Sequence, residues 1–164
     1  MNEFSAALGL LQLQHVDDAL EARRRIDEAY RDLLRDVPGI RCIDRSGQTV
    51  ANHAYFPILV GPACPVGRDA LYQRLKDEGI HGRRYFFPLI SSFPMYRGLP
   101  SAARAHLPVA HEVAEQVLCL PIYPGLTDEQ VAKVAQVIRT AARVSSAPRS
   151  TVAVAVSGPA QALP

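Results

Sequence analysis

The stretch VLCLPIYPGLTDEQV, residues 117–131, carries the strongest local signals in the chain. Four apolar residues followed by Pro121 predict a brief buried strand, because proline cannot continue a hydrogen-bonded ladder. Thr127 with Gln130 three residues later forms a capping box, which predicts that a helix begins there. The apolar face of this helix consists of Val131, Val134, Ile138 and Ala141.

Upstream, helical periodicity marks the first 37 residues. Apolar positions recur every three to four residues from Phe4 to Leu34, which predicts one long helix or two helices joined near His15. The basic triplet at 23–25 has acidic residues at helical spacing on both sides, so we interpret it as a solvated helix face. The Pro-Gly pair at 38–39 then ends the helix.

Short apolar runs in the middle of the chain predict strands. Two of these runs are residues 40–43 and residues 54–60. Pro57 lies within the second run and cannot donate a ladder hydrogen bond, which implies an edge or bulge position. The other expected elements are a helix over 69–78, a strand that begins at Ile80, and a helix over 108–116 before the strand at 117–120.

This order of elements predicts an α/β fold, a small layer in which helices cover a three- or four-stranded sheet. Residues 1–143 are expected to form its one domain. From 144 to 164 the composition shifts to Ala, Ser, Pro, Gly and Val without an acidic residue, which predicts a disordered tail. The alternation at 151–156 leaves an edge strand as the alternative for part of it.

Length, composition and charge exclude several functional classes. A chain of 164 residues with 48% hydrophobic and 21% charged residues is long enough for one packed domain. The net charge of +2 is spread along the chain, so we expect no nucleic-acid partner. No apolar run reaches the roughly 18 residues that span a membrane, and the first residues lack a basic signal region. Three cysteines without C-x-x-C spacing are expected to be buried and reduced, which places the protein in the cytoplasm.

No self-contained catalytic centre is recognisable in the sequence. The five histidines lack metal-binding spacing, and phosphate-binding glycine loops and the nucleophile elbow are missing. One cluster, residues 82–89 with its continuation to Arg97, combines adjacent guanidinium groups with aromatic rings and prolines. Such groups suit the binding of phosphate or carboxylate and stacking on a sugar or base. The alternative is that these rings are a satellite of the hydrophobic core.

Three groups of residues, in order along the chain, resemble a known family. They are residues 1–13 with 23–30, residues 83–91, and residues 107–110 with 117–124. They are similar to the opening helix, the substrate-side loop, and the closing helix and strand of the C-terminal half of the DegT/StrS-type aminotransferases. That family consists of pyridoxal-phosphate enzymes of the aspartate aminotransferase fold, which build amino sugars on nucleotide carriers. The resemblance implies a small C-terminal domain with a long N-terminal helix.

The sequence also departs from that family. The resemblance implies pyridoxal 5'-phosphate as cofactor of the complete enzyme, held as a Schiff base by a lysine of a large upstream domain. Neither Lys76 nor Lys133 lies in the Ser-x-x-Lys context of that lysine. We therefore expect no catalytic residue and no covalently bound cofactor on this chain. The family's G-x-N-x-R-M stretch, whose asparagine reaches a neighbouring subunit's cofactor phosphate, would precede Met1.

The resemblance implies substrate-binding roles for six residues. Four of them match the loop that lines the sugar-nucleotide site, and two match the strand that approaches the mouth of the active site. For His53 the alternative is a strand residue with satisfied hydrogen bonds. The six residues are Arg83, Arg84, Tyr85, Phe87, His53 and Tyr55.

We therefore expect the C-terminal domain, or a truncated reading frame, of a dTDP-keto-sugar transaminase that is inactive without its large domain and dimeric when complete. The alternative is a non-catalytic sugar-nucleotide-binding or interaction module that partners a full-length homologue. A small helical regulator with no sugar connection remains only if the matching segments are coincidental. In the absence of the large domain, the first helix should expose apolar surface.

Overall fold

The computed structural model describes residues 2–44 and 51–143, and the tail expected at 144–164 lies outside this part of the chain. The described elements are α1 (Glu3–Leu13), α2 (Val16–Leu34), β1 (Ile40–Cys42), β2 (Phe56–Val60), α3 (Arg68–Asp77), α4 (Pro108–Gln116), β3 (Val117–Leu120) and α5 (Asp128–Arg143). Three short 3-10 turns lie between α3 and α4, at Ile90–Ser92, Pro100–Ala102 and Arg104–His106.

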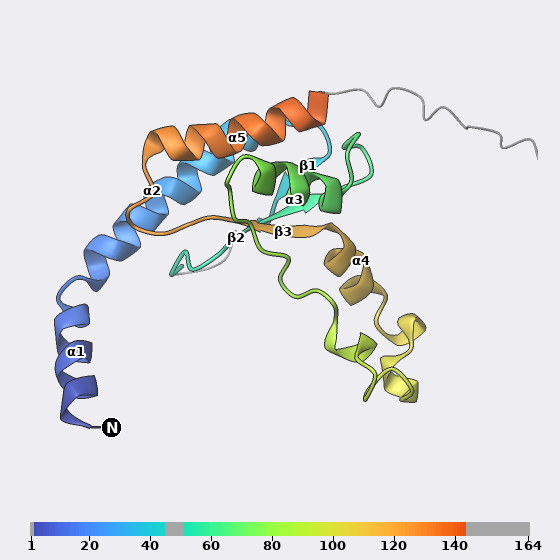
Figure 1. Cartoon of the computed structure of the whole chain (residues 1–164), viewed down its shortest axis with the longest axis horizontal. Helices are drawn as coiled ribbons and strands as arrows, with labels where there is room; N and C mark the ends of the chain where they lie inside the picture. Colours follow the sequence, from blue (N-terminus) through green and yellow to red (C-terminus); the bar gives the residue numbers. More distant parts are fainter. Residues whose placement is uncertain (1, 45–50, 144–164) are drawn as a thin grey trace, which may run out of the picture.

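The strands form one antiparallel sheet in the order β1-β2-β3. Because side chains alternate along a strand, Phe56, Ile58 and Val60 point to one face, which α2, α3 and α5 cover (Figure 1). Leu59 and Cys119 are buried on the opposite face, against which α4 packs. The predicted α/β layer is thus confirmed, with three strands.

The hydrophobic core lies between the sheet and the three helices that cover it. Tyr30 of α2 is completely buried, and its ring lies 4.9 Å from that of Phe56. The Tyr30 hydroxyl donates a hydrogen bond of 3.1 Å to the carbonyl of Pro121. This contact joins α2 to the segment that connects β3 with α5. Other fully buried side chains are Leu34, Leu71, Leu75, Leu118, Val131 and Ile138.

Local signals place the helix ends where the structure has them. The opening segment is two helices that meet at residues 14–15, as one of the two alternatives predicts. At α5, the backbone N–H of Thr127 donates to Oε1 of Gln130, and the N–H of Gln130 donates to the Thr127 hydroxyl. This is the predicted capping box. Gly39 has φ +73°, and a Cβ there would lie 2.0 Å from the nitrogen of Cys64, so only glycine fits this turn.

The prediction of a strand that begins at Ile80 is wrong. Within the described segment 80–89 only Arg83 pairs with β3: its N–H donates to the Cys119 carbonyl at 2.9 Å, and its carbonyl accepts from the Cys119 N–H at 2.7 Å. Gly82 allows this close approach, because a Cβ there would lie 3.2 Å from the same carbonyl oxygen. Beyond Arg83 the chain leaves the sheet, so a single bridge replaces a fourth strand.

The edge or bulge position expected for Pro57 is also not observed, since β2 is the central strand. Cys119, which lies opposite Pro57, directs its N–H and its carbonyl to Arg83, so the Pro57–Cys119 pair is not hydrogen-bonded. The Pro57 nitrogen therefore faces the side of β1, whose last paired residue, Cys42, lies opposite Ile58. Among the described residues no ladder partner needs a donor at that point, and proline is tolerated.

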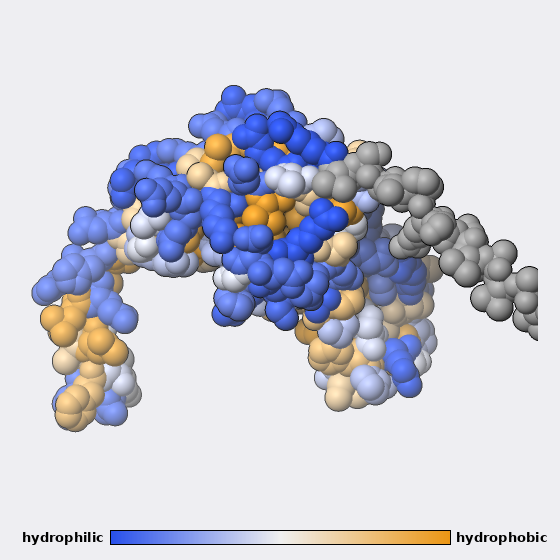
Figure 2. All heavy atoms as spheres, turned by 45° about the horizontal axis from the view of Figure 1, so that its top comes forward, coloured by the Kyte–Doolittle hydropathy of each residue, from blue (hydrophilic) through white to orange (hydrophobic). Residues whose placement is uncertain are grey.

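Two parts of the chain project from the sheet to the same side and give it the shape of an arch (Figure 1). One is α1, which buries none of its side chains, and the other is the segment of 3-10 turns with α4. Phe4 is 88% exposed, and the apolar surface of α1 is visible in Figure 2. The exposed apolar surface expected on the first helix is confirmed. Further exposed side chains on α1 are Leu8, Leu10, Leu11 and Leu13.

Candidate functional site

A cavity of about 670 Å³ lies between the end of α3, the bridge at Arg83, the end of β3 and the first turns of α5. Three of the six predicted site residues, Tyr55, Arg83 and Tyr85, line it. Tyr55 reaches it from the residue before β2, and the other two come from the segment after α3. The structure therefore brings together half of the predicted set.

Arg83 and Tyr85 form a pair of polar groups at this cavity. The backbone of Arg83 is fixed on β3 by its two hydrogen bonds with Cys119. Its guanidinium donates to the Tyr85 hydroxyl oxygen at 2.6 Å, and the Tyr85 ring meets the Tyr55 ring edge-on with centroids 5.2 Å apart. Among the described residues Arg83 has no carboxylate partner. An exposed guanidinium beside two phenols is a surface suited to an anion and to a planar ring.

Arg84 and Phe87 do not line the cavity, because both are held against α3. The Arg84 guanidinium lies 2.9 Å from Oδ1 of Asp69 and over the ring of Tyr72, at 4.8 Å from its centroid. Two guanidinium groups contact the Phe87 ring, that of Arg84 at 5.1 Å and that of Arg68 at 4.7 Å from its centroid. The side chains of the adjacent residues thus lie in different places, Arg83 at the cavity and Arg84 on α3.

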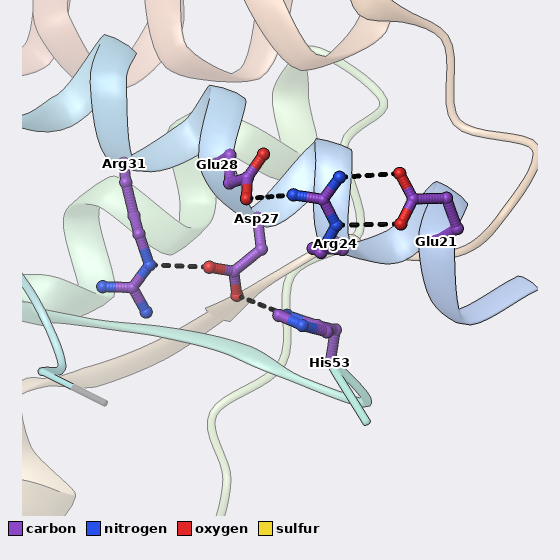
Figure 3. Close-up of polar contacts among 6 residues, drawn as sticks. All are labelled: Glu21, Arg24, Asp27, Glu28, Arg31 and His53. Carbon is purple, nitrogen blue, oxygen red and sulfur yellow. Dashed lines mark hydrogen bonds and ion pairs between the residues drawn. The ribbon is translucent and has the colours of Figure 1, made fainter. Parts of the chain in front are cut away.

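His53 lies outside the cavity and outside the Arg84–Phe87 contacts. Its side chain points to Asp27 of α2 (Figure 3). Its Nδ1 lies 3.4 Å from Oδ2 of Asp27, and Oδ1 of this buried carboxylate accepts a hydrogen bond of 2.6 Å from Nε of Arg31. Arg31 also donates to the carbonyl of Ile43 at the end of β1. His53 adopts φ +48°, an unfavourable conformation for a residue other than glycine. The cluster connects the residues before β2 to α2, and His53 itself lies outside the strand in which it was expected.

The basic triplet is a solvated face, as predicted. Arg24 makes ion pairs with Glu21 and Glu28 one helical turn away on either side (Figure 3). The Arg24 hydrogen bond, followed by the charges of Arg24 and Arg25, lowers the pKa of Glu21. These exposed pairs contribute little to stability.

Neither lysine fits a cofactor held as a Schiff base. Lys133 does line the cavity, but its Nζ lies 3.3 Å from a carboxylate oxygen of Glu78 and donates to the Glu78 carbonyl at 3.2 Å. A Schiff-base amine needs to be uncharged and free to attack, and this side chain is more than half exposed in an ion pair. Nζ of Lys76 lies over the ring of Tyr72 on the exposed side of α3. Neither lysine is thus placed in this structure as a Schiff-base amine would be.

Metal ligands and cysteine thiols are further candidate groups among residues 2–44 and 51–143. No three His, Cys, Asp or Glu side chains there are grouped to hold a metal ion, and no helix there is long and apolar enough to cross a bilayer. Cys119 lines the cavity, but burial raises the pKa of its thiol, which disfavours the nucleophilic thiolate. The expected burial of the cysteines is confirmed for Cys64 and Cys119, and Cys42 is half-buried.

Sequence reasoning missed Arg68, the buried guanidinium beside Phe87. Its side chain is 3% exposed and donates to the carbonyls of Ala114 and Val117 at 2.9 and 3.1 Å. A signal was present, since Arg68 occupies the first turn of α3, where the helix dipole disfavours a cation. Arg68 itself does not line the cavity. Polar residues that do line it and were not predicted as site residues, such as His81, Tyr123 and Gln130, carry no comparable signal.

Comparisons with known proteins identify the family of this chain. The chain matches the DegT/DnrJ/EryC1/StrS aminotransferase family over residues 1–139. It is 46% identical over 138 residues to the dTDP-4-amino-4,6-dideoxy-D-glucose transaminase of Escherichia coli, with 84% of this chain and 37% of that protein covered. It is 31% identical over 139 residues to the GDP-perosamine synthase of Vibrio cholerae, covering 85% of this chain and 37% of that protein.

Solved structures show the same relation. The crystal structure of DesI in the presence of its TDP-sugar product superimposes with a TM-score of 0.78 at 34% identity, covering 87% of this chain and 36% of that one. That of S. venezuelae DesV in complex with a ketimine intermediate also gives a TM-score of 0.78, at 27% identity and with 37% of that chain covered. The chain thus spans little more than a third of the length of these relatives. With a family match over most of its residues and the fold of these enzymes' domain, the chain belongs to the DegT/DnrJ/EryC1/StrS aminotransferase family.

Proposed function

We propose that this chain is the C-terminal small domain of a pyridoxal-phosphate-dependent sugar-nucleotide transaminase, with a dTDP-keto-sugar as substrate. Its own contribution is to bind the sugar nucleotide at the cavity of Tyr55, Arg83 and Tyr85. The observation that carries the proposal is the exposed guanidinium of Arg83 beside two phenol rings, in a chain of this family. An anionic diphosphate suits the guanidinium, and a sugar or base ring suits the phenols.

The complete enzyme would use pyridoxal phosphate to move an amino group from a donor such as glutamate to the keto-sugar. We propose that the present chain does not transaminate alone, because Lys76 and Lys133 are both unsuited to hold the cofactor. Incubation with pyridoxal phosphate, dialysis and borohydride reduction tests this. We expect no stoichiometric adduct by mass spectrometry, and a stable adduct on one lysine would overturn it.

The partner of this domain would be the large domain of the same enzyme or a full-length homologue, within a homodimer. Support comes from α1, whose apolar side chains have no cover in the described chain. We also propose that it works in the cytoplasm, which agrees with the free thiols of Cys42, Cys64 and Cys119.

Sugar-nucleotide binding can be tested directly on this chain. Titration calorimetry with dTDP-glucose should show binding that Arg83→Met weakens by about tenfold or more, the effect of removing a charge-assisted contact. The matched control is Arg25→Met, an exposed arginine of α2, which should bind like the unchanged protein. Equal affinities for all three proteins would contradict the site.

The alternative is a non-catalytic module that binds sugar nucleotides or a full-length homologue in its own right. Both hypotheses predict that this chain binds dTDP-glucose, so transamination separates them. Transamination that appears when the large domain of a relative is added would favour the enzyme fragment, and binding without transamination under the same conditions would favour the module.

A further inference from the structure

Arg68 has an unusual environment for a charged side chain. It lies in the first turn of α3, at the positive end of that helix dipole. Its side chain, including the guanidinium, is buried. Its Nη1 donates to the carbonyls of Ala114 and Val117, at the C-terminal end of α4. The side chain therefore carries its charge from the positive end of one helix to the negative end of another, where two carbonyls lack helical partners.

The same guanidinium also contacts the segment that carries the cavity residues. It lies 4.7 Å from the centroid of the Phe87 ring, and Arg84 lies 5.1 Å from that centroid. Oδ1 of Asp69 lies 2.8 Å from Nε of Arg68 and 2.9 Å from Nη1 of Arg84. One carboxylate and one aromatic ring thus join the two cations, which would otherwise repel each other.

These contacts determine where Arg83 and Tyr85 can lie. Arg83 is held on β3 by its backbone, and Arg84 and Phe87 are held on α3, so the intervening Tyr85 is fixed from both sides. Arg83 and Tyr85 face the cavity. Their side chains make no hydrogen bond, ion pair or ring contact with the side chains of Arg68, Asp69, Arg84 or Phe87. Arg68 is therefore connected to them through the backbone, by residues 83–87 and by β3, whose Val117 it contacts and whose Cys119 holds Arg83.

We propose that Arg68 is a positioning residue, which sets the orientation of Arg83 and Tyr85 at the cavity by anchoring Phe87 and the end of α4 to α3. In this arrangement Arg84 and Phe87 act through the anchor and do not touch the ligand. The ligand part of this inference rests on the proposed function, whereas the positioning of Tyr85 does not.

The experiment uses the full chain labelled with 3-fluorotyrosine, in which Tyr85→Phe assigns the fluorine resonance of Tyr85. Arg68→Met removes the charge and the fork of donors, and Arg68→Lys keeps the charge without the fork. Ile26→Val is the control, because it shortens a buried side chain of α2 and lowers stability without contacting this cluster. Spectra are recorded without ligand and during titration with dTDP-glucose, at a temperature at which each variant is folded.

We expect Arg68→Met to shift or broaden the Tyr85 resonance without ligand, and Arg68→Lys to restore part of the change. We also expect affinity for dTDP-glucose to fall by about tenfold in Arg68→Met and to stay unchanged in Ile26→Val, since one charge-assisted contact is misplaced. A lower melting temperature with an unmoved Tyr85 resonance would show a purely structural role and overturn the proposal. If no protein binds dTDP-glucose but the resonance still moves in Arg68→Met, the sugar-nucleotide site fails and the positioning role stands.

Discussion

Substitution of Tyr30 by phenylalanine should change stability in opposite directions at neutral and at alkaline pH. The side chain is completely buried and donates one hydrogen bond of 3.1 Å to the Pro121 carbonyl. Loss of that bond costs about 1 kcal/mol at pH 7. The ring contact with Phe56 remains in Tyr30→Phe, so no cavity term is added.

Alkaline pH reverses the comparison because the folded protein holds the phenol in its neutral form. Burial, and secondarily the charge of Tyr123, raises the pKa of Tyr30 far above the ordinary value of 10.0. Because the folded pKa is raised, the stability that the neutral phenol contributes is complete below pH 10, the unfolded pKa. It is lost as the pH rises above 10, since there the unfolded chain releases the proton and the folded chain keeps it. At pH 11, one unit above the unfolded pKa, the loss is about 1.4 kcal/mol. The phenylalanine variant has no such loss.

The two stability curves should therefore cross between about pH 10 and pH 11, where the linkage loss reaches the contribution of the hydrogen bond. The assay is urea denaturation followed by far-ultraviolet circular dichroism at pH 7, 9, 10 and 11. Tyr96→Phe is the control, because that ring is 44% exposed and its curve should follow the unchanged protein at every pH. Parallel curves for Tyr30→Phe and the unchanged protein would refute the inferred burial of the phenol.

Three further predictions test other parts of the structure. Thr127→Ala removes the capping hydroxyl of α5 and should lower the free energy of unfolding by about 1 kcal/mol in urea denaturation. Asp27→Ala breaks the buried pair with Arg31 and should lower the free energy of unfolding by about 3 kcal/mol. Glu28→Ala, at an exposed pair, is the control and should lower it by less than about 0.5 kcal/mol. Similar values for the two variants would contradict the burial of Asp27. Leu8→Lys with Leu11→Lys should convert self-associated protein to monomer in size-exclusion chromatography with light scattering, with stability changed by less than about 0.5 kcal/mol.

Elements with local signals could be predicted from the sequence, and those that depend on a distant partner could not. The capping box of Thr127 and Gln130 identifies the start of α5, since both partners lie within one turn. The strand expected from Ile80 has suitable residues, but whether it forms depends on how many of them pair with β3. Only Arg83 of this segment pairs there, with Cys119, and the next residue, Arg84, pairs with Asp69 of α3 instead. Pro57 in a central strand likewise depends on where β1 ends.

The candidate site shows the same limit at the scale of single side chains. Adjacent Arg83 and Arg84 suggest one double guanidinium, but an extended backbone directs neighbouring side chains to opposite sides. Which side faces the cavity depends on Asp69 and Phe87, and the sequence contains no local sign of that choice. Arg68 could have been suspected from its place in the first turn of α3, although only the fold brings the end of α4 to it.

The helicity of α1 requires an explanation outside the described chain. An isolated helix of 11 residues is marginal in water, and tertiary packing normally provides the missing stability. Here no side chain of α1 is buried, yet apolar residues occur on all sides of it. Burial of Phe4 and the four leucines against a partner would contribute about 1.5–3 kcal/mol for each side chain, which is ample to hold the helix. We therefore expect α1 to lie in an interface, and we expect the same surface, when left uncovered, to make this domain associate with itself.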